Sequence, residues 1–574
     1  MKHLLKQLKA YRKESILGPL FKLLEAGFEL LVPLLVAAMI DQGVKLGDKS
    51  VIVRMSLMMV GLGLIGLLCS VTAQYFAAKA AVGSTTRLRR ALFAHLQTLS
   101  YTELDTIGAS TMLTRLTSDM NQVQSGVNLT LRLALRSPFV VFGAMVMAFT
   151  IDVHAASVFA IVIPILFAVV FGVMIVCIPL YRKVQARLDR VLGMTRENLT
   201  GVRVLRAFGR EEEQKREFSA RNDALTKEQN HVGRISVLLN PVTYVIINLA
   251  IVALIRTGAL RVESGALSQG DVIALYNYMS QILVELIKLA NLVLNITRAA
   301  ACCNRIGAVL EIKSSQHSPQ TEPETTADAP AIEFRRAGLR YAGAGGDALD
   351  GISFRAEKGQ TIGVIGGTGS GKTTLVNLIP RFYDATEGSV LVDGVPVGQY
   401  PLESLRRRIG VVPQKAVLFH GTIRENLLWG DPDAGDGTLR EALRAAQAEE
   451  IVQGKEGGLD FEIEQGGRNL SGGQRQRLTI ARALVRKPEI LILDDSASAL
   501  DFATDAALRK ALRALPERPT VVIVSQRTSS IRHADQIIVL DNGHMVGLGT
   551  HEELLRTCEV YREIHESQYK KEER

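Results

Sequence analysis

Residues 361–373 read TIGVIGGTGSGKT, and this stretch decides the fold of the carboxy-terminal half of the chain. A β-branched apolar run, Thr361–Ile365, leads into Gly366-Gly-Thr-Gly-Ser-Gly-Lys372-Thr373, and a helical apolar pattern follows over Thr374–Ile379. A strand, a glycine-rich turn ending in Lys-Thr and a helix occur in this order in phosphate-binding loops. The glycines let backbone N–H groups close around phosphate oxygens, and the helix presents its positive end to them. In this context a bare glycine-rich turn is the weaker interpretation.

The chemistry of each side chain assigns roles within and beyond this loop. The Lys372 ammonium would pair with the β- and γ-phosphates, and the Thr373 hydroxyl would ligate Mg²⁺. Downstream, Ile490–Asp494 is an apolar strand that ends in a carboxylate, so Asp494 is a predicted Mg²⁺ ligand. Alone, that segment would read as an ordinary strand before an acidic turn. The predicted phosphate-binding residues are Gly366, Gly367, Thr368, Gly369, Ser370, Gly371, Lys372, Thr373 and Thr374.

The amino-terminal half contains a series of long apolar segments. A bilayer-spanning helix needs about 20 apolar residues. Six segments meet this length: 16–40, 52–77, 131–151, 155–181, 236–255 and 272–296. The chain has 574 residues and is 47% hydrophobic yet 22% charged, which suits a membrane half joined to a soluble half. A chain of this length also exceeds what a single core can organise.

Loop lengths and basic residues predict the orientation of these spans. Long charged stretches separate spans two and three and spans four and five, whereas the other loops are short. Residues 182–234 carry about a dozen Lys and Arg, and residues 41–50 carry two. Because inner loops collect basic residues, the long stretches and both termini are predicted to be cytoplasmic. The net charge of +9 is attributed to this topology and not to a nucleic-acid partner.

A polar stretch rich in Pro and Thr, residues 313–330, separates the two halves. The sequence therefore predicts a transmembrane domain over 1–311 with long helical inner loops, a linker over 312–330 and an α/β domain over 331–574. In the last of these, β-branched runs alternate with helical patterns, as in a mainly parallel sheet. The first 13 residues lack a signal-peptide cleavage site and fit a basic amphipathic helix on the inner membrane surface. The five cysteines show no metal-ligand spacing and are expected to be reduced thiols.

Further motifs resemble the ABC transporter family. Leu470-Ser-Gly-Gly-Gln474 matches the family's signature, Gln414 in VVPQ matches its Q-loop, and Ser498-Ala-Leu-Asp501 matches its D-loop. Tyr341, about 25 residues before the phosphate loop, resembles the aromatic residue that stacks on adenine. LSGGQ in this order and spacing is a very specific signal.

The resemblance extends over nearly the whole chain. Residues 107–119 resemble the first inner loop of exporters, and residues 197–212 resemble the second. In that family the tips of these loops are short coupling helices that dock on ATP-binding domains, one of them on the partner subunit. The implied fold class is a membrane all-α exporter domain of six helices fused to an α/β P-loop nucleotide-binding domain. The implied protein is a bacterial half-size exporter of the type IV fold, located in the inner membrane.

The resemblance also implies a mechanism that uses ATP and Mg²⁺ as cofactors. Two ATP-binding domains would close head to tail, each ATP being held between one chain's phosphate loop and the other's signature. Closure would switch the membrane helices from inward-facing to outward-facing. Gln414 would sense the γ-phosphate and help to hold Mg²⁺, and Asp501 would belong to the hydrolytic machinery. The residues expected to contact the partner's ATP are Ser471, Gly472, Gly473 and Gln474.

Two positions depart from the family pattern. Asp495 stands where the family has the Glu that orients the attacking water, and Gln526 stands where it has a His. The shorter Asp withdraws the carboxylate by on the order of 1 Å, and a misplacement of that size can cost roughly a hundredfold in rate. Gln can donate a hydrogen bond but carries no charge. The pair resembles the non-consensus subunit of heterodimeric exporters, whose own site binds MgATP but hydrolyses it poorly and whose signature completes the fast site of a partner with Glu, His and a degenerate signature.

The sequence leaves the cargo open. Mostly aliphatic spans suit drug-like or lipid-like amphiphiles, although lipid-facing helices look the same. Glu25 and Glu29 are candidates to face a cavity, because ionisable groups in a span are functional candidates, but a structural role fits them as well. Glu285 and Lys288, three residues apart, can pair with each other. The alternatives are a slow homodimeric exporter, a peptide exporter and an importer with an exporter fold; the six spans exclude a soluble ABC ATPase acting on DNA or ribosomes.

Overall fold

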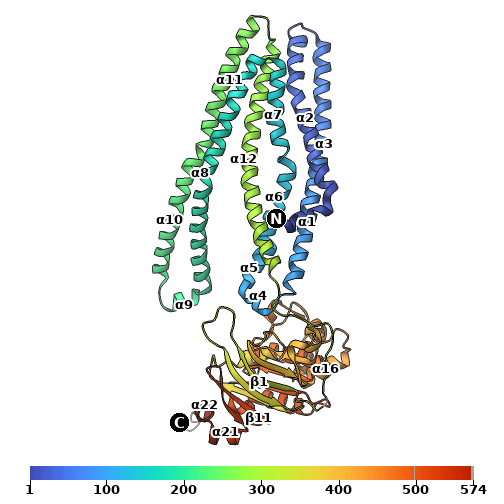
Figure 1. Cartoon of the computed structure of the whole chain (residues 1–574), viewed down its shortest axis with the longest axis vertical. Coiled ribbons are helices and arrows are strands. Elements are labelled where there is room, and N and C mark those ends of the chain that lie inside the picture. The colour runs from blue at the N-terminus through green and yellow to red at the C-terminus, as the bar shows by residue number, and fades with distance from the viewer. Residues whose placement is uncertain (327, 497, 570–574) are drawn as a thin grey trace. The chain divides into compact units, whose positions relative to one another are not determined.

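A computed structural model describes residues 1–326, 328–496 and 498–569 of the chain. The described residues form two compact units (Figure 1). Unit one consists of Met1–Gln97 and Ser110–Ile312, and unit two consists of Thr98–Ala109 and Lys313–Arg574. Unit two thus takes in a short segment from between the second and third apolar regions of the chain. The last residues of the predicted 331–574 domain, 570–574, lie outside the described residues.

Unit one consists of helices, of which six continuous runs are long and apolar enough to cross a membrane. This confirms the predicted six-span class. The 48-residue helices α3 and α8 extend far beyond their apolar parts. At 1.5 Å per residue each is about 70 Å long, more than twice the roughly 30 Å of a hydrocarbon core. The helices are α1 (Lys2–Leu8), α2 (Arg12–Ala38), α3 (Lys49–Leu96), α5 (Ala109–Thr114), α6 (Met120–Leu133), α7 (Arg136–Ile151), α8 (Val153–Thr200), α9 (Val202–Ala207), α10 (Glu211–Val237), α11 (Leu239–Glu263) and α12 (Gln269–Glu311).

Within unit one, α8 and α10 run side by side away from the other helices, and α9 joins them at the far end (Figure 1). The prolines of α8 lie in its first 27 residues, and α10 contains none. Without an interior proline, nothing removes a backbone hydrogen bond from these extensions. The continuous helices predicted past the apolar segments are therefore observed.

Charged side chains inside the spans are paired with one another. Arg136, which is buried, donates to Glu285 at 2.5 Å and to Glu29 at 2.6 Å, so that it joins α7 to α12 and α2. Lys288 donates to Glu285 at 2.8 Å, which confirms the predicted pair. Glu25 accepts a hydrogen bond from a lysine one turn earlier on α2 at 2.5 Å. Since removing one partner of a buried pair leaves an uncompensated charge, these contacts fix how the three helices pack.

The described part of unit two is built on two larger β-sheets and the two-stranded sheet β7-β8, with helices around them. Its elements are α4 (Tyr101–Ile107), β1 (Ile332–Leu339), β2 (Leu349–Ala356), β3 (Thr361–Gly366), α13 (Lys372–Leu378), β4 (Glu387–Val392), β5 (Val395–Pro396), α14 (Leu402–Arg408), β6 (Ile409–Val412), β7 (Gly421–Thr422), α15 (Ile423–Leu428), α16 (Asp436–Ala445), α17 (Glu449–Gln453), β8 (Glu462–Ile463), α18 (Gly472–Val485), β9 (Ile490–Asp494), α19 (Phe502–Arg513), β10 (Thr520–Val524), α20 (Thr528–Ile531), β11 (Gln536–Asp541), β12 (His544–Gly549), α21 (His551–Thr557) and α22 (Glu559–Tyr569).

The larger sheet has the strand order β12-β11-β3-β10-β9-β6 and is parallel except for β12. Every residue of β3, β9 and β10 is buried, as expected for parallel strands covered on both faces. This confirms the predicted mainly parallel sheet. A second, antiparallel sheet of order β2-β1-β4-β5 was not predicted. Parallel pairing places the carboxy ends of β3, β10 and β9 at one edge, which is where α/β proteins bind ligands.

Helix α4 packs against residues 382 and 383 of the same unit. The Tyr101 ring lies 4.8 Å from the Phe382 ring between centroids, and the Tyr383 hydroxyl donates to Asp105 at 2.6 Å. The docked helix α4 therefore lies almost entirely before residues 107–119, the stretch that resembles the first exporter loop. Those residues contain the last residue of α4, then α5, and then a π-helical turn that leads into α6.

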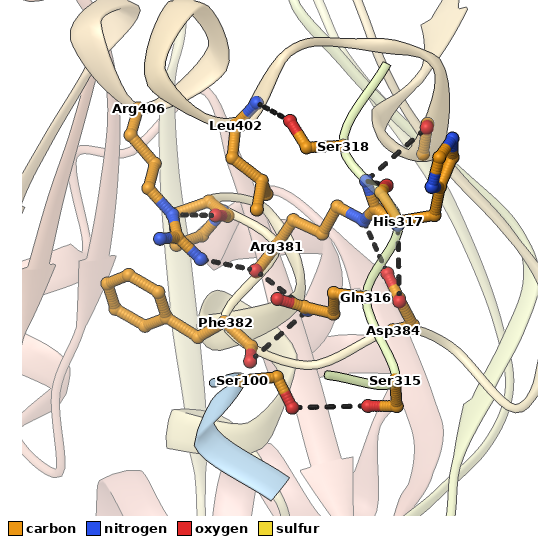
Figure 2. A network of polar contacts seen from close by, with 12 residues as sticks. Ser100, Ser315, Gln316, His317, Ser318, Arg381, Phe382, Asp384, Leu402 and Arg406 are labelled. Carbon is orange, nitrogen blue, oxygen red and sulfur yellow. Dashed lines mark hydrogen bonds and ion pairs between the residues drawn. The ribbon is translucent and has the colours of Figure 1, made fainter. Parts of the chain in front are cut away.

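Residues 315–318 lie along the loop around Arg381 (Figure 2). The Gln316 amide donates to the main-chain oxygen of Arg381 at 3.1 Å, and Arg406 donates to the same oxygen at 2.9 Å. The buried Arg381 guanidinium in turn donates to the main-chain oxygen of His317 at 2.9 Å. This part of the predicted linker is thus held by specific hydrogen bonds to unit two.

Candidate nucleotide-binding site

A cavity of about 530 Å³ opens at the carboxy ends of β3, β9 and β10. It brings together residues that are up to 202 positions apart in the sequence, from Tyr341 to Gly543. The cavity is lined by Tyr341, Asp347, Ala348, Thr368, Gly369, Gly371, Lys372, Thr373, Thr374, Gln414, Asp494, Asp495, Val524, Gln526, Asn542 and Gly543. Eleven of the residues predicted from the sequence are among them. Gly366, Gly367 and Ser370 belong to the same loop without lining the cavity.

The conformation of the loop requires glycine at its last turn. Gly371 has a φ of 98°, in the left-handed region that side chains rarely adopt. A Cβ atom there would lie 2.7 Å from a Leu349 methyl carbon and 2.8 Å from the main-chain oxygen of Ala348. The loop therefore approaches the start of β2 closely, and this contact directs the chain into α13.

Lys372 begins α13 and points back over the loop. Its ammonium donates to the main-chain oxygens of Gly366 at 2.9 Å and Gly367 at 2.5 Å. Partial burial lowers the pKa of Lys372, while the nearby carboxylates of Asp495 and Asp494 act in the opposite direction. A partly desolvated cation held at the centre of a glycine loop is suited to pairing with phosphate oxygens.

Two oxygen ligands face each other across the cavity floor. The Thr373 hydroxyl on α13 lies 3.0 and 3.2 Å from the two carboxylate oxygens of Asp494 at the end of β9. Asp494 is 5% exposed, and burial raises its pKa, as does the charge of Asp495, although the Thr373 hydrogen bond and Lys372 lower it. Hydroxyl and carboxylate oxygens are ligands that Mg²⁺ accepts. The residues present therefore fit a Mg²⁺ ion beside a bound phosphate.

The two departures from the family pattern both reach this cavity. Asp495 has a φ of 47°, which is uncommon for a residue other than glycine, and its N–H donates to the main-chain oxygen of Val524 at 3.0 Å. The Gln414 amide donates to the Asp495 carboxylate at 3.3 Å. The backbone of Gln526 is held by the Gln568 amide at 2.7 Å. The structure thus places Asp495, Gln414 and Gln526 together.

The signature residues lie outside this cavity. Ser471 caps α18, and its hydroxyl accepts from the Gln474 N–H at 3.2 Å while the Gln474 side chain accepts from the Ser471 N–H at 3.0 Å. Asp501 caps α19 and accepts from the Thr504 N–H at 2.8 Å, which lowers the pKa of its carboxyl. Among the described residues, the cavity lining includes no member of 471–474 and not Asp501. One chain alone therefore forms half of the predicted sandwich.

Sequence reasoning missed four polar or small residues of the lining. Asp347 and Ala348 precede β2, and Asn542 and Gly543 form the turn between β11 and β12. Both turn residues have positive φ values, 46° and 84°, as the Asn-Gly hairpin turn requires. The Asn-Gly pair could have indicated a hairpin, but no local signal shows that this turn meets the phosphate loop.

Tyr341 connects the cavity to α4. Its hydroxyl donates to the Thr374 hydroxyl at 3.1 Å, which fixes the ring at the cavity edge. The ring meets Tyr383 edge to face with centroids 5.1 Å apart, and Tyr383 donates to Asp105. Tyr341, the residue predicted to stack on adenine, is therefore linked to α4 through Tyr383.

Comparison with known proteins agrees with this geometry. The ABC transporter transmembrane region matches residues 15–286, and the ABC transporter domain matches residues 349–498. An uncharacterised ABC transporter ATP-binding protein of Mycobacterium tuberculosis H37Rv is 38% identical over 98% of this chain and 97% of its own. The uncharacterised YfiB of Bacillus subtilis is 35% identical over 100% and 99%. An ATP-dependent lipid A-core flippase of Chromobacterium violaceum is 30% identical over 99% and 97%.

The fold is shared with a bacterial Atm1-family ABC exporter solved with ATP bound. The TM-score is 0.80 at 23% identity, over 97% of this chain and 98% of that chain. The chain belongs to the ABC transporter family. It is a half-size ABC transporter with the fold of an exporter, a multi-pass membrane protein whose ATPase domain is coupled to transport, and domains of this class bind ATP with Mg²⁺.

The close approach at Gly371 predicts a defect specific to this position. Gly371→Ala introduces a Cβ into a strained backbone and a filled space, so MgATP affinity should fall at least about tenfold, the effect of roughly 1.4 kcal/mol. Binding of a fluorescent ATP analogue to the detergent-solubilised chain measures this. Gly346→Ala, whose Cβ meets nothing within 4 Å, is the matched control and should bind normally. Unchanged affinity in Gly371→Ala would refute the assigned loop geometry.

Proposed function

We propose that this chain is the slow-site subunit of a heterodimeric exporter that moves drug-like or lipid-like amphiphiles out of the cytoplasm or inner leaflet. It would lie in a bacterial inner membrane with both termini in the cytoplasm. The observation that carries the proposal is that Asp495 and Gln526 enter the same cavity as an intact phosphate loop. Both changes affect hydrolysis, while the residues for holding nucleotide are retained.

In this proposal the cavity residues divide into binding and hydrolytic groups. Tyr341 stacks on adenine, Lys372 pairs with the β- and γ-phosphates, and the loop N–H groups surround the phosphates. Thr373, Asp494 and Gln414 hold Mg²⁺, which when bound neutralises phosphate charge. The partner's signature closes the site from the other side.

Hydrolysis would be slow because the attacking water is poorly held. The left-handed backbone at Asp495 and its short side chain set where the carboxylate reaches, and its hydrogen bond from Gln414 at 3.3 Å limits its freedom. A general base must lie within about 2.6–3.2 Å of the proton that it abstracts. Gln526 adds no positive charge against the γ-phosphate. The site therefore retains ATP as a ligand that keeps the two domains closed.

The proposed cargo class is supported by the spans and by one relative. The charged residues Glu29, Arg136 and Glu285 form ion pairs with one another. The exposed large apolar side chains of the spans are mostly Leu, Val and Ile. The lipid A-core flippase at 30% identity is named for a lipid substrate. An amphiphile with a large apolar part fits such a surface.

Restoring the two family residues should accelerate this site. In the assembled dimer, with the partner's own catalytic Glu replaced by Gln, Asp495→Glu with Gln526→His should raise ATPase turnover at least about tenfold, within the roughly hundredfold that a 1 Å misplacement can cost. Asp433→Glu with Gln453→His, at two exposed positions of the same unit, is the control. No increase, or vigorous ATPase from a homodimer of the unaltered chain, would contradict the slow-site assignment.

A groove in unit two is suited to receive a coupling helix from the partner. Its volume is about 410 Å³, and Phe419 and Trp429 stack at its rim with centroids 4.4 Å apart. Trp429 remains 61% exposed. Exposed aromatic pairs of this kind favour an interface over free solvent.

Three guanidinium groups, those of Arg406, Arg482 and Arg486, also line the groove, and burial lowers the pKa of each. One Arg482 nitrogen is buried without a hydrogen-bond partner among the described residues. A buried donor without a partner costs free energy, and the carbonyl end of a docked helix would satisfy it.

The occupant that we propose is helix α9 of the other subunit. In this chain α9 presents Val204, which is 60% exposed, and Phe208, which is 76% exposed and ends the helix. Helix α9 lies at the far end of α8 and α10, away from the other helices of unit one (Figure 1). An exposed apolar helix end is suited to an aromatic groove in which one buried Arg482 nitrogen lacks a hydrogen-bond partner among the described residues.

A photo-crosslinking amino acid at Val204 tests this docking. The proposal predicts a covalent product between this chain and the second subunit, with the attached peptide mapping to the groove around the position of Trp429. The same probe at Phe218, which is exposed on α10, is the control and should give no such product. Attachment only within the chain, or equal attachment from both positions, would reject the assignment.

A further inference from the structure

A second cavity, of about 420 Å³, lies in unit two where β3 and β10 begin. Thr361 and Val521, near the first residues of these strands, line it. The nucleotide cavity lies at the other ends of the same strands. Ile523 of β10 also lines the second cavity, and its neighbour Val524 lines the nucleotide cavity, but successive side chains of a strand point to opposite faces of the sheet. Among the described residues the two cavities have no lining residue in common, so the second cavity is not an extension of the nucleotide cavity.

Basic side chains converge on this second cavity from three parts of the chain. Helix α19 supplies three of them, the loop before β10 supplies one, and the segment after α20 supplies two. They are Arg509, Lys510, Arg513, Arg518, Arg532 and His533. The floor between them is apolar and includes Leu512, Val521 and Ile523.

Little negative charge offsets these groups. Arg509 pairs with Asp505 at 3.1 Å. Among the described residues, no carboxylate forms an ion pair with Lys510, Arg513, Arg518 or Arg532. Asp535, next to the lining, accepts the Thr361 N–H at 2.7 Å.

The surroundings of His533 show the effect of these positive charges. The Arg532 Nε donates to Nε2 of His533 at 2.9 Å, and Arg513 donates to the main-chain oxygen of His533 at 2.6 Å. Burial lowers the pKa of His533, and Arg532, Arg513 and Arg509 lower it further. A ring that accepts from a guanidinium and resists protonation lies in a positive field.

Helix stabilisation explains only part of this arrangement. Lys510 and Arg513 lie in the last turn of α19, where cations interact favourably with the helix dipole. Arg532 caps the carboxy end of the four-residue α20, whereas Arg518 lies in the loop before β10, at no helix end, yet both line the same space. A preference for cations at helix ends does not explain why basic residues from three parts of the chain line one cavity.

We propose that this cavity binds a compact anion that carries two or more phosphate groups. Guanidinium groups bind phosphate oxygens through pairs of parallel hydrogen bonds, and Arg513, Arg518 and Arg532 approach from different elements. The volume lies within the roughly 300–1,000 Å³ of small-ligand sites. Among the lining residues that the structure describes there is no Phe, Tyr or Trp, so the ligand is recognised chiefly by its phosphates.

Binding of inorganic tripolyphosphate tests the proposal. Full-length protein in neutral detergent is first saturated with a non-hydrolysable MgATP analogue, which occupies the phosphate loop and reports that unit two is folded. Equilibrium dialysis with labelled tripolyphosphate should then show saturable binding of one molecule per chain. Arg518→Glu with Arg532→Glu should lower this affinity at least about tenfold, since each charge-assisted bond contributes strongly.

The matched control is Arg440→Glu with Arg556→Glu, which reverses two exposed charges elsewhere in unit two. It should change tripolyphosphate affinity less than about twofold, because screening weakens distant exposed charges. If the cavity variant no longer binds the ATP analogue, Arg518→Gln alone takes its place and should weaken binding about threefold or more. Absence of saturable binding, equal losses in cavity and control variants, or unaltered affinity in the cavity variant would overturn the proposal.

Discussion

Parallel pairing of β3, β10 and β9 is the constraint on which the nucleotide site depends. Val521 pairs with Thr361 and with Leu491, so the three strands run in register toward one edge. At that edge the phosphate loop, Asp494 and the segment that carries Gln526 emerge side by side. The Thr373 hydroxyl then reaches Asp494 at 3.0 Å across two elements that are far apart in the sequence. Strands without this register would leave a phosphate loop with no metal ligand beside it.

The signature residues of this chain lie outside its own nucleotide cavity. The signature begins α18, whose amino end is closed by the reciprocal hydrogen bonds of Ser471 and Gln474. That helix start, with its favourable field for anions, does not line the cavity of its own chain. In the proposed sandwich a second subunit presents the equivalent helix start, and in the proposed heterodimer the two subunits divide binding and hydrolysis between their two sites.

The sequence predicted those features whose signals are local. The phosphate loop, the terminal Asp494 of an apolar strand and the six spans are each encoded in one short stretch, and the structure has the predicted α/β and six-helix classes. Contacts between distant residues were not predictable in this way. Nothing in the sequence near Asn542 shows that its turn borders the nucleotide cavity, and nothing near Glu29 shows that Arg136 would pair with it. Helix α4 was missed because its docking on Phe382 depends on rings that are 281 residues apart.

The central claim is that each ATP is held between the phosphate loop of one chain and the signature of the other. An ATP analogue with a photoreactive group on its γ-phosphate tests it in dimers where this chain carries Lys372→Ala and the second subunit is unaltered. The account predicts that residues 471–474 of this chain are still labelled, although its own loop no longer holds nucleotide. If the label on those residues disappears with Lys372→Ala, the signature serves its own loop and the account is wrong.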